Sequence, residues 1–282
     1  MLIILTKRAI SKEIEFGIPI ISVGNIIVGG SGKTPVTIKL ASKYDENACI
    51  ILRGYGRDSK GLYVVSLNGK ILEDVKTSGD EAMLLANSLP KATIIVSENR
   101  IKAILKAKEL GCKIIFLDDG FSKYKIAKFN ILLRPKNEPT NIFCLPSGGY
   151  REPKGFYAQA DIELVEEKDF KRVITIKKDG RVSELPIKTI VITAISKPKR
   201  LLEYLPKDIK MISFPDHYTF TKDDISKIQE ENKDYVILTT GKDFVKLKEL
   251  DIKNLYLMDL DIQISENTDF TLMEEYINSF NK

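Results

Sequence analysis

The chain has 282 residues, 43% hydrophobic and 29% charged, so it can bury the core of one large α/β domain or of two smaller ones, and its composition excludes a disordered protein. A net charge of +5 favours anionic ligands or an anionic membrane surface, but the lysines and arginines are dispersed and do not indicate nucleic-acid binding. Cys49, Cys112 and Cys144 form no CxxC pair, which predicts buried thiols in a reducing compartment.

The first ten residues combine a short apolar stretch with the basic residues Lys7 and Arg8. The stretch is too short to cross a bilayer and lacks the features of a signal peptide, so we expect the chain to stay in the cytoplasm. Two interpretations of Met1–Ile10 remain open: a segment that lies on a membrane surface, or the ordinary first helix or strand of the fold.

A phosphate-binding loop follows the first predicted strand, Ile18–Val23. It reads Ile27-Val28-Gly29-Gly30-Ser31-Gly32-Lys33-Thr34 and departs from the usual pattern at its first position, where Ile27 replaces glycine. The glycines let backbone N–H groups face an anion, Lys33 can reach the outer phosphates, and Thr34 is placed to hold Mg²⁺. An ordinary glycine-rich turn is the alternative, which Lys and Thr directly after the glycines disfavour.

The next helix is predicted over Pro35–Lys43 and the next strand over Cys49–Leu52. This strand leads into Arg53-Gly54-Tyr55-Gly56-Arg57, at the sheet edge where ligands of open α/β sheets bind. We expect this loop to contact substrate or phosphate, with a solvated turn as the alternative. Leu62–Leu67 and Lys70–Leu72 then flank an Asn-Gly dipeptide, which predicts a hairpin with a type I′ turn.

Two adjacent carboxylates, Asp80 and Glu81, begin a predicted helix whose apolar run is Ala82–Ala86. Ser78 and Glu81 have the spacing of a capping box, so these acids can simply start the helix. In a protein that binds Mg-nucleotide, they can also serve as a metal ligand and a proton acceptor. The segment alone leaves both interpretations open.

A second pair of acids follows a predicted strand over Thr93–Val96 and a helix over Ile101–Leu110. The apolar run Lys113–Leu117 is typical of a strand buried on both faces, and it places Asp118 and Asp119 at the sheet edge beside the phosphate loop. Two such acids can also form a plain turn. With a phosphate loop upstream, we interpret them as a Walker B pair.

The hydrophobic pattern restarts after a turn-rich loop over Leu145–Pro153. Asp161–Glu166 and Arg172–Ile176 predict a small hairpin, which we interpret as the link to a second α/β unit from Thr189 to about Met258. The remaining predicted strands are Ile131–Leu133, Thr189–Ala194, Lys210–Phe214 and Tyr235–Thr239, and the remaining helices are Pro198–Leu205, Lys222–Glu230 and Phe270–Phe280.

The only histidine of the chain, His217, lies in the loop sequence Phe214-Pro215-Asp216-His217. A lone histidine is usually structural, and the loop position and the preceding Asp216 are the features that favour catalysis. Thr240-Gly241-Lys242-Asp243 ends another predicted strand, where a helix N-terminus and a functional turn are equally compatible with the residues.

Together these motifs resemble the tetraacyldisaccharide 4′-kinase family, the lipid A 4′-kinases, from Ile18 to about Val245. Several motifs in the same order are more specific than any one of them. The motifs are Val23-Gly24-Asn25, Val28-Gly29-Gly30-Ser31-Gly32-Lys33-Thr34-Pro35, Arg53-Gly54-Tyr55-Gly56-Arg57, Gly79-Asp80-Glu81, Asp118-Asp119-Gly120, Leu145-Pro146 with Arg151-Glu152-Pro153, and Phe214-Pro215-Asp216-His217.

The resemblance implies a P-loop NTPase-like α/β/α domain and a smaller α/β domain joined by a two-stranded linker, with the active site between them. We expect the P-loop kinase domain over residues 1–158, with a helix at 268–282 packing back on it, a hairpin linker over 159–178 and the smaller domain over 179–267. The implied reaction transfers the ATP γ-phosphoryl group to the 4′-hydroxyl of an acylated glucosamine disaccharide 1-phosphate, giving lipid IVA. The protein is then expected at the cytoplasmic face of the inner membrane, peripherally bound.

The resemblance also implies site roles, by motif. Asp80 would take the hydroxyl proton with His217 as its partner from the other domain, and Lys33 and Asp119 would complete the catalytic set. ATP would bind over Ile27–Thr34. Three residues are expected to hold Mg²⁺ and four to bind the lipid substrate: Thr34, Glu81 and Asp118 for the metal, and Arg53, Tyr55, Arg100 and Arg151 for the substrate.

This chain departs from the family in three places. Ser122-Lys123 stand where the family usually has Gln-His, so the role of that second histidine is lost or passes to Lys123. The family's Thr-Glu-Lys-Asp appears as Thr240-Gly241-Lys242-Asp243. The family's apolar membrane helix is reduced to a stub before Ile18, which leaves membrane association to the basic surface and the acylated substrate.

Two other functions fit part of the pattern. A P-loop GTPase or metallochaperone-type NTPase needs a guanine-reading N/T-K-x-D motif, which Thr240–Asp243 resembles by spacing, but it leaves His217 and the Arg53–Arg57 loop without a role. A non-enzymatic, nucleotide-gated interaction protein would depend on Lys33 and not on Asp80.

Overall fold

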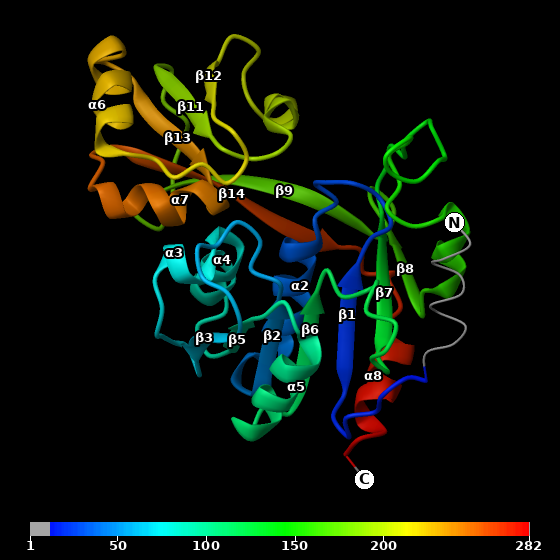
Figure 1. Ribbon diagram of the computed structural model, residues 1–282. Helices are drawn as coiled ribbons and strands as arrows, with labels where there is room; N and C mark the ends of the chain where they lie inside the picture. The colour runs from blue at the N-terminus through cyan, green and yellow to red at the C-terminus, as the bar shows by residue number, and fades with distance from the viewer. Residues whose placement is uncertain (1–11, 282) are drawn as a thin grey trace.

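The computed structural model describes residues 12–281, and both expectations for Met1–Ile10 lie outside the described residues. Two sheets rich in parallel pairs organise the chain, one of eight strands and one of six. Figure 1 shows the smaller sheet above the larger one, with the long strands β9 and β14 running between them. Along the part of the chain described, no helix combines the length and the apolar character needed to span a bilayer.

The larger sheet has the strand order β4-β3-β5-β2-β6-β1-β7-β8. Its central strands are buried apolar runs because helices cover both faces: α2, α4 and α8 pack on one face and α5 on the other. The strands are β1 (Ile20–Gly24), β2 (Ala48–Leu52), β3 (Tyr63–Leu67), β4 (Lys70–Ile71), β5 (Thr93–Val96), β6 (Ile114–Asp118), β7 (Phe129–Arg134) and β8 (Ile162–Val165). The helices are α2 (Lys33–Ala41), α3 (Val75–Ser78), α4 (Asp80–Ser88), α5 (Arg100–Glu109) and α8 (Thr271–Asn278), with 3-10 turns η1 (Ser42–Asn47) and η2 (Lys154–Gln159).

The smaller sheet has the order β10-β9-β14-β13-β11-β12. Its apolar core lies between β11, β13 and the amphipathic helix α6. The strands are β9 (Phe170–Lys178), β10 (Arg181–Val182), β11 (Thr189–Thr193), β12 (Lys210–Ser213), β13 (Val236–Thr240) and β14 (Leu255–Ile264). The helices are η3 (Pro198–Tyr204), α6 (Lys222–Glu231), α7 (Gly241–Leu247) and η4 (Lys248–Leu250).

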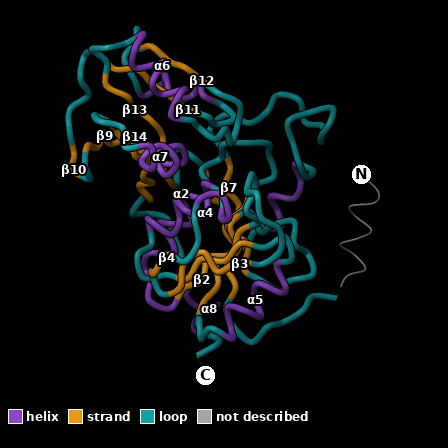
Figure 2. Tube along the Cα trace, turned by 60° about the vertical axis from the view of Figure 1, so that its left-hand side comes forward, coloured by secondary structure: helices purple, strands orange, loops and turns teal. Residues whose placement is uncertain are grey.

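One edge of the larger sheet collects the chemistry-bearing loops. Strands β2, β6, β1 and β7 run parallel, so their carboxyl ends meet at that edge. The glycine-rich loop leaves β1 there, and Asp118 ends β6 in register with Val23. Figure 2, turned from Figure 1, shows α7 of the smaller sheet beside α2 and α4 of the larger one, so the smaller unit overhangs this edge.

The predicted link between the two units is wrong in its pairing. Segment Asp161–Glu166 does not pair with Arg172–Ile176 as a hairpin: β8 joins the larger sheet parallel to β7, and β9 pairs antiparallel with β14 from Phe170–Ile264 to Lys178–Tyr256. The linker is therefore two-stranded, but its second strand comes from the end of the chain. The domain boundaries expected from the sequence stay a prediction.

Three smaller expectations have clear outcomes. The hairpin of β3 and β4 is confirmed, with φ of 47° at Asn68 and 82° at Gly69, as a type I′ turn requires. The helix expected over Pro198–Leu205 is a 3-10 helix, Pro198–Tyr204. Only Cys49 among the cysteines is fully buried, because Cys112 lies in the connection before β6 and Cys144 in the long loop after β7, where both are partly buried.

Candidate functional site

The glycine-rich loop has the backbone of an anion site. Gly29, Gly30 and Gly32 all have positive φ, at 73°, 52° and 83°, conformations that side chains other than glycine rarely adopt. Helix α2 begins directly after them with no side-chain cap, so its first N–H groups are free to face an anion. Lys33 Nζ lies 3.1 Å from Asn25 Oδ1 and 3.7 Å from Asp119 Oδ1, at the mouth of the loop.

Asp118 is joined to the start of α2. Thr34 Oγ1 donates to its carboxylate at 2.8 Å and Thr37 Oγ1 at 3.3 Å. Burial, followed by the negative charge of Glu81, raises the pKa of Asp118 to about 6, although Lys33 and Thr34 oppose the shift. A cation beside Asp118 and Glu81 would relieve this excess of negative charge. Of the described residues, no three acidic, His or Cys side chains are grouped to hold a metal by themselves.

Asp119 has a different partner from its neighbour. Arg151 donates to both of its carboxylate oxygens, at 2.6 and 2.8 Å, and also reaches Asn25 Oδ1 at 2.5 Å. Burial would raise the pKa of Asp119, but the hydrogen bonds of Arg151 and the charge of Lys33 lower it to about 2. The two adjacent acids therefore differ in charge balance. Arg151 keeps Asp119 ionised, whereas the positive charge near Asp118 is too small to offset its burial.

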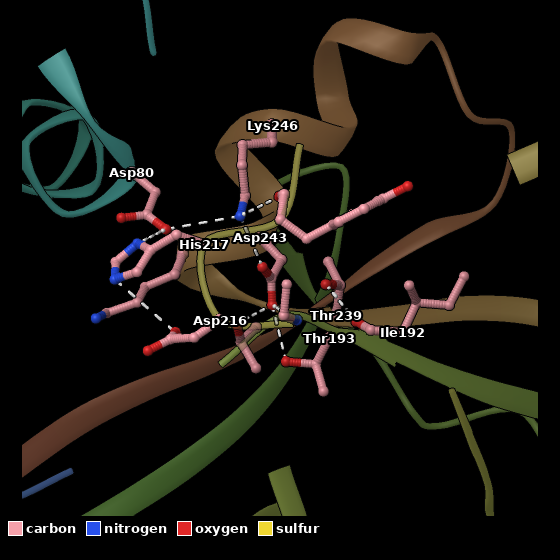
Figure 3. Close-up of polar contacts among 12 residues, drawn as sticks. Asp80, Ile192, Thr193, Asp216, His217, Thr239, Asp243 and Lys246 are labelled. Atoms are coloured by element: carbon pink, nitrogen blue, oxygen red, sulfur yellow. Dashed lines mark hydrogen bonds and ion pairs between the residues drawn. The ribbon is translucent and has the colours of Figure 1, made fainter. Parts of the chain in front are cut away.

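Asp80 and His217 meet across the two sheets. Asp80 is the first residue of α4 and is 5% exposed, and His217 lies in the loop after β12. His217 Nδ1 is 3.1 Å from Asp80 Oδ2, and Figure 3 shows the ring pointing toward that carboxylate. Burial would raise the pKa of Asp80, but His217, Lys242 and Lys246 lower it below its ordinary value. The same hydrogen bond raises the pKa of His217 against the effect of burial.

The loop Arg53–Arg57 packs against the His217 ring. The Tyr55 and His217 rings lie 5.0 Å apart, centroid to centroid, and a Cβ atom on Gly56 would come within 2.8 Å of His217 Cγ. His217 itself has a φ of 62°, and its N–H donates to Ala194 O at 3.0 Å. The glycine is therefore required for the close approach of this loop to the histidine.

Two lysines of α7 belong to the site and were missed as site residues. Lys242 pairs with Glu81, and Lys246 Nζ lies 3.6 Å from Asp80 Oδ2. Asp243, fully buried, holds this helix start by accepting from Thr193 Oγ1 at 2.8 Å and from Ala194 N at 3.0 Å. The sequence signal for these lysines was Thr240-Gly241-Lys242-Asp243, which is equally compatible with a helix start and with a functional turn. It is a helix start whose two lysines face the acids of α4.

The four residues expected to bind substrate have different surroundings. Arg53 and Tyr55 are exposed on their loop, whereas Arg151 is engaged by Asp119. Arg100 is only 4% exposed and donates to Ser97 O, and burial lowers its pKa to about 10. Lys123, in place of the family's histidine, is close enough to Arg100 and Arg53 that their charges, after burial, lower its pKa. Arg100 and Lys123 thus both lie near Asp119, and Arg53 lies near these two cations.

Comparison with known proteins gives the family. Residues 2–277 match the model described as Tetraacyldisaccharide-1-P 4′-kinase. The chain is 75% identical over 280 residues to Tetraacyldisaccharide 4′-kinase of Aliarcobacter butzleri (strain RM4018), covering 99% of this chain and 89% of the relative. It is 45% identical over 259 residues to Tetraacyldisaccharide 4′-kinase of Helicobacter pylori (strain ATCC 700392 / 26695), covering 92% and 80%.

The structure is similar to the crystal structure of the "apo" form of LpxK from Aquifex aeolicus in complex with ATP. The TM-score is 0.76 at 28% identity, covering 98% of this chain and 92% of the other. The expected fold class is confirmed: a P-loop NTPase-like α/β/α domain with a smaller α/β domain on a two-stranded linker.

Proposed function

This chain belongs to the tetraacyldisaccharide-1-P 4′-kinase family, and from this we propose how its own residues perform the reaction. It is a kinase that transfers a phosphoryl group from ATP to the 4′-hydroxyl of a tetraacyldisaccharide 1-phosphate, giving lipid IVA in lipid A biosynthesis. One observation carries our assignment of roles: the Asp80–His217 pair lies over the same sheet edge as the glycine-rich loop and Asp118.

The glycine-rich loop and Lys33 are the proposed ligands of the ATP phosphates. Phosphoryl transfer spreads charge over the transferred oxygens, so fixed N–H groups and a positioned ammonium lower its barrier. Mg²⁺ fits the oxygen donors of Thr34, Asp118 and Glu81, because P-loop proteins hold it with few side chains and complete its shell with phosphates and water. Bound there, Mg²⁺ supplies charge neutralisation for the phosphates.

Asp80 is the proposed acceptor of the 4′-hydroxyl proton. Its lowered pKa keeps it ionised at neutral pH, and its carboxylate is fixed by Glu81 N at 2.8 Å and by His217. His217 orients the carboxylate and shares its charge, and Lys246 offsets the remaining charge. Because the histidine comes from the smaller sheet, the pair depends on how the two units are packed.

Arg53 and Tyr55 are the proposed contacts to the lipid substrate, since both are exposed and the Tyr55 ring lies beside that of His217. Arg151 acts through Asp119, whose carboxylate it fixes. Arg100 contributes its charge from a buried position. We further propose peripheral binding at the cytoplasmic face of the inner membrane, because the acylated substrate is confined to a bilayer and the chain carries a net charge of +5. Nucleic acid is not a partner in this account.

A GTPase or metallochaperone-type NTPase is the alternative function, and one contact disfavours it. The guanine-reading acid of such a protein has to be exposed to the base, whereas Asp243 is fully buried and bonded to Thr193 and Ala194. Comparing the affinities for ATP and GTP separates the two functions. We expect a clear preference for ATP, and a preference for GTP would favour the alternative.

Phosphate transfer from γ-labelled ATP tests the function directly. We expect label in a tetraacyldisaccharide 1-phosphate presented in mixed micelles, and none in a reaction without lipid. Lys33→Ala is expected to abolish transfer, because it removes the ammonium at the phosphates. Hydrolysis of ATP at the same rate with and without lipid, and no labelled lipid, would contradict the function.

A further inference from the structure

Three cationic side chains of the smaller unit and its linker reach across to the glycine-rich loop. Lys197 Nζ donates to Val28 O at 3.1 Å, and Arg200 Nη1 donates to Gly30 O at 2.6 Å. Arg172, on β9, donates to the same Gly30 O at 2.8 Å. Backbone carbonyl oxygens are therefore the acceptors that these cations share.

The charges of these side chains are not balanced. Arg172 Nε lies 2.7 Å from Glu166 Oε1, so it has its own carboxylate. In the described stretch, 12–281, neither Lys197 nor Arg200 has a carboxylate within 4.0 Å. The guanidinium groups of Arg172 and Arg200 converge on one carbonyl oxygen, and Glu166 pairs with only the first of them, so the charge of Arg200 has no paired carboxylate to offset it.

The glycines of the loop make this approach possible. A Cβ atom on Gly30 would lie 2.7 Å from Arg200 Nη1, and one on Gly29 would lie 3.2 Å from Lys197 Cε. The ends of the two flexible side chains therefore lie directly against the backbone of the loop, in space that a Cβ atom would occupy.

A cavity of about 610 Å³ lies at this contact. The loop residues Ile27–Gly30 line one side, the segment Pro135–Pro139 after β7 lines another, and Lys197, Arg200, Glu203 and Tyr204 line the side of the smaller unit. Glu166 and Glu167 also line it. Its volume is within the range of small-molecule sites. It adjoins Ile27–Gly30 of the loop that we assign to the phosphates, and both Lys197 and Arg200 line it.

We propose that Lys197 and Arg200 are ligands that the smaller unit contributes to the phosphate chain of ATP. The proposal rests on the proposed binding of ATP at the glycine-rich loop. The ammonium and guanidinium groups exchange neutral carbonyl acceptors for phosphate oxygens, and hydrogen bonds between ionised partners are the stronger ones. Because η3 and the His217 loop lie before and after the same strand, β12, bound ATP then also holds His217 over Asp80.

The test measures affinities for ATP and for adenosine by displacement of a fluorescent ATP analogue. We expect Arg200→Gln and Lys197→Gln each to weaken ATP binding about tenfold or more while adenosine binding stays within about twofold. Lys199→Gln is the matched control: it removes an exposed lysine of the same η3 segment and is expected to bind ATP like the wild type. Arg200→Lys, which keeps the charge, is expected to recover part of the affinity.

Two results would overturn the inference. The first is an unchanged ATP affinity in both glutamine variants. The second is an equal loss of affinity for ATP and for adenosine, which would mean that these residues shape the cavity without binding phosphate. Circular dichroism of each variant shows that a loss is not unfolding. This test can be told apart from the test of the function. If the wild type phosphorylates lipid and Arg200→Gln keeps full ATP affinity, only the role of η3 is rejected. A wild type that phosphorylates no lipid rejects the function.

Discussion

His217 and Asp80 lie 137 residues apart in the sequence, and His217 Nδ1 is 3.1 Å from Asp80 Oδ2. The carboxylate comes from the first turn of α4 on the larger sheet and the imidazole from a loop of the smaller sheet. This contact therefore reports on both the chemistry of the site and the packing of the two units.

His217 is the only histidine, so its titration can be followed by proton NMR without assignment. We expect a pKa above the ordinary value of 6.5 in the wild type and a lower one in Asp80→Asn, where the neutral amide no longer favours the imidazolium and burial still disfavours it. Asp216→Asn is the control, since Asp216 is 3.8 Å from Nε2 and more exposed. A wild-type value at or below 6.5 would contradict the contact.

The same pair predicts how stability depends on pH. The folded pKa of His217 is raised, so its contribution is fully present below the unfolded value of 6.5 and is lost as the pH rises through the folded value. The folded pKa of Asp80 is lowered, so its contribution is present above 3.8 and is lost as the pH falls through the folded value. Both contributions are fully present between pH 3.8 and 6.5, so urea unfolding from pH 4 to 9 should show a smaller loss of stability above pH 6.5 in Asp80→Asn than in the wild type.

Gly56→Ala should lower turnover through the position of His217. The added Cβ would meet the ring at 2.8 Å, at a φ of 73°. Gly61→Ala is the matched control, because Gly61 also has a positive φ, 93°, but nothing within 4 Å of the added atom. We expect kcat to fall about tenfold or more in the first variant and little in the second. Equal losses would show that backbone strain, and not the ring contact, is responsible.

Thr34→Val should reduce the stimulation of transfer by Mg²⁺. The substitution keeps the shape of the side chain and removes the hydroxyl that bonds Asp118 at 2.8 Å. Thr37→Val removes the other hydroxyl on that carboxylate, one turn farther along α2, and should leave the Mg²⁺ requirement close to that of the wild type. Titrating Mg²⁺ at fixed ATP measures both. The metal assignment fails if Thr34→Val shows the wild-type requirement.

Asp243→Ala should destabilise the smaller unit by about 3 kcal/mol, because it leaves the Thr193 hydroxyl and the Ala194 N–H buried without their acceptor. The control Asp234→Ala removes a carboxylate that is paired with Lys188 at the surface, and the unfolding midpoint should not change. Urea denaturation compares the two. Similar midpoints in both variants would contradict a structural role for Asp243.

The sequence predicted the elements of this site better than their pairing. Local signals identified the loop before Lys33, the strand before Asp118 and the positions of Asp80 and His217, because each lies next to a strand end or a helix start. Their roles stay predictions. Strand β14 was missed because its partner, β9, lies far away in the sequence and no turn joins the two. Two adjacent alternating segments were therefore paired with each other instead.

Long-range contacts account for the other omissions. Lys246 carries no motif of its own, and its role appears only when α7 packs against α4. Lys197 and Arg200 look like ordinary surface cations, and only the fold brings them to Val28 and Gly30. The alternation of charge and apolar residues does not encode which cation faces which loop.

Single-turnover phosphoryl transfer by Asp80→Asn, with ATP affinity measured on the same sample, tests the central claim most directly. We predict that transfer to the tetraacyldisaccharide 1-phosphate slows by about 10²- to 10⁴-fold while ATP affinity stays within about twofold of the wild type, because only the proton acceptor has been removed. Transfer at the wild-type rate with ATP affinity intact would show that Asp80 is not the base.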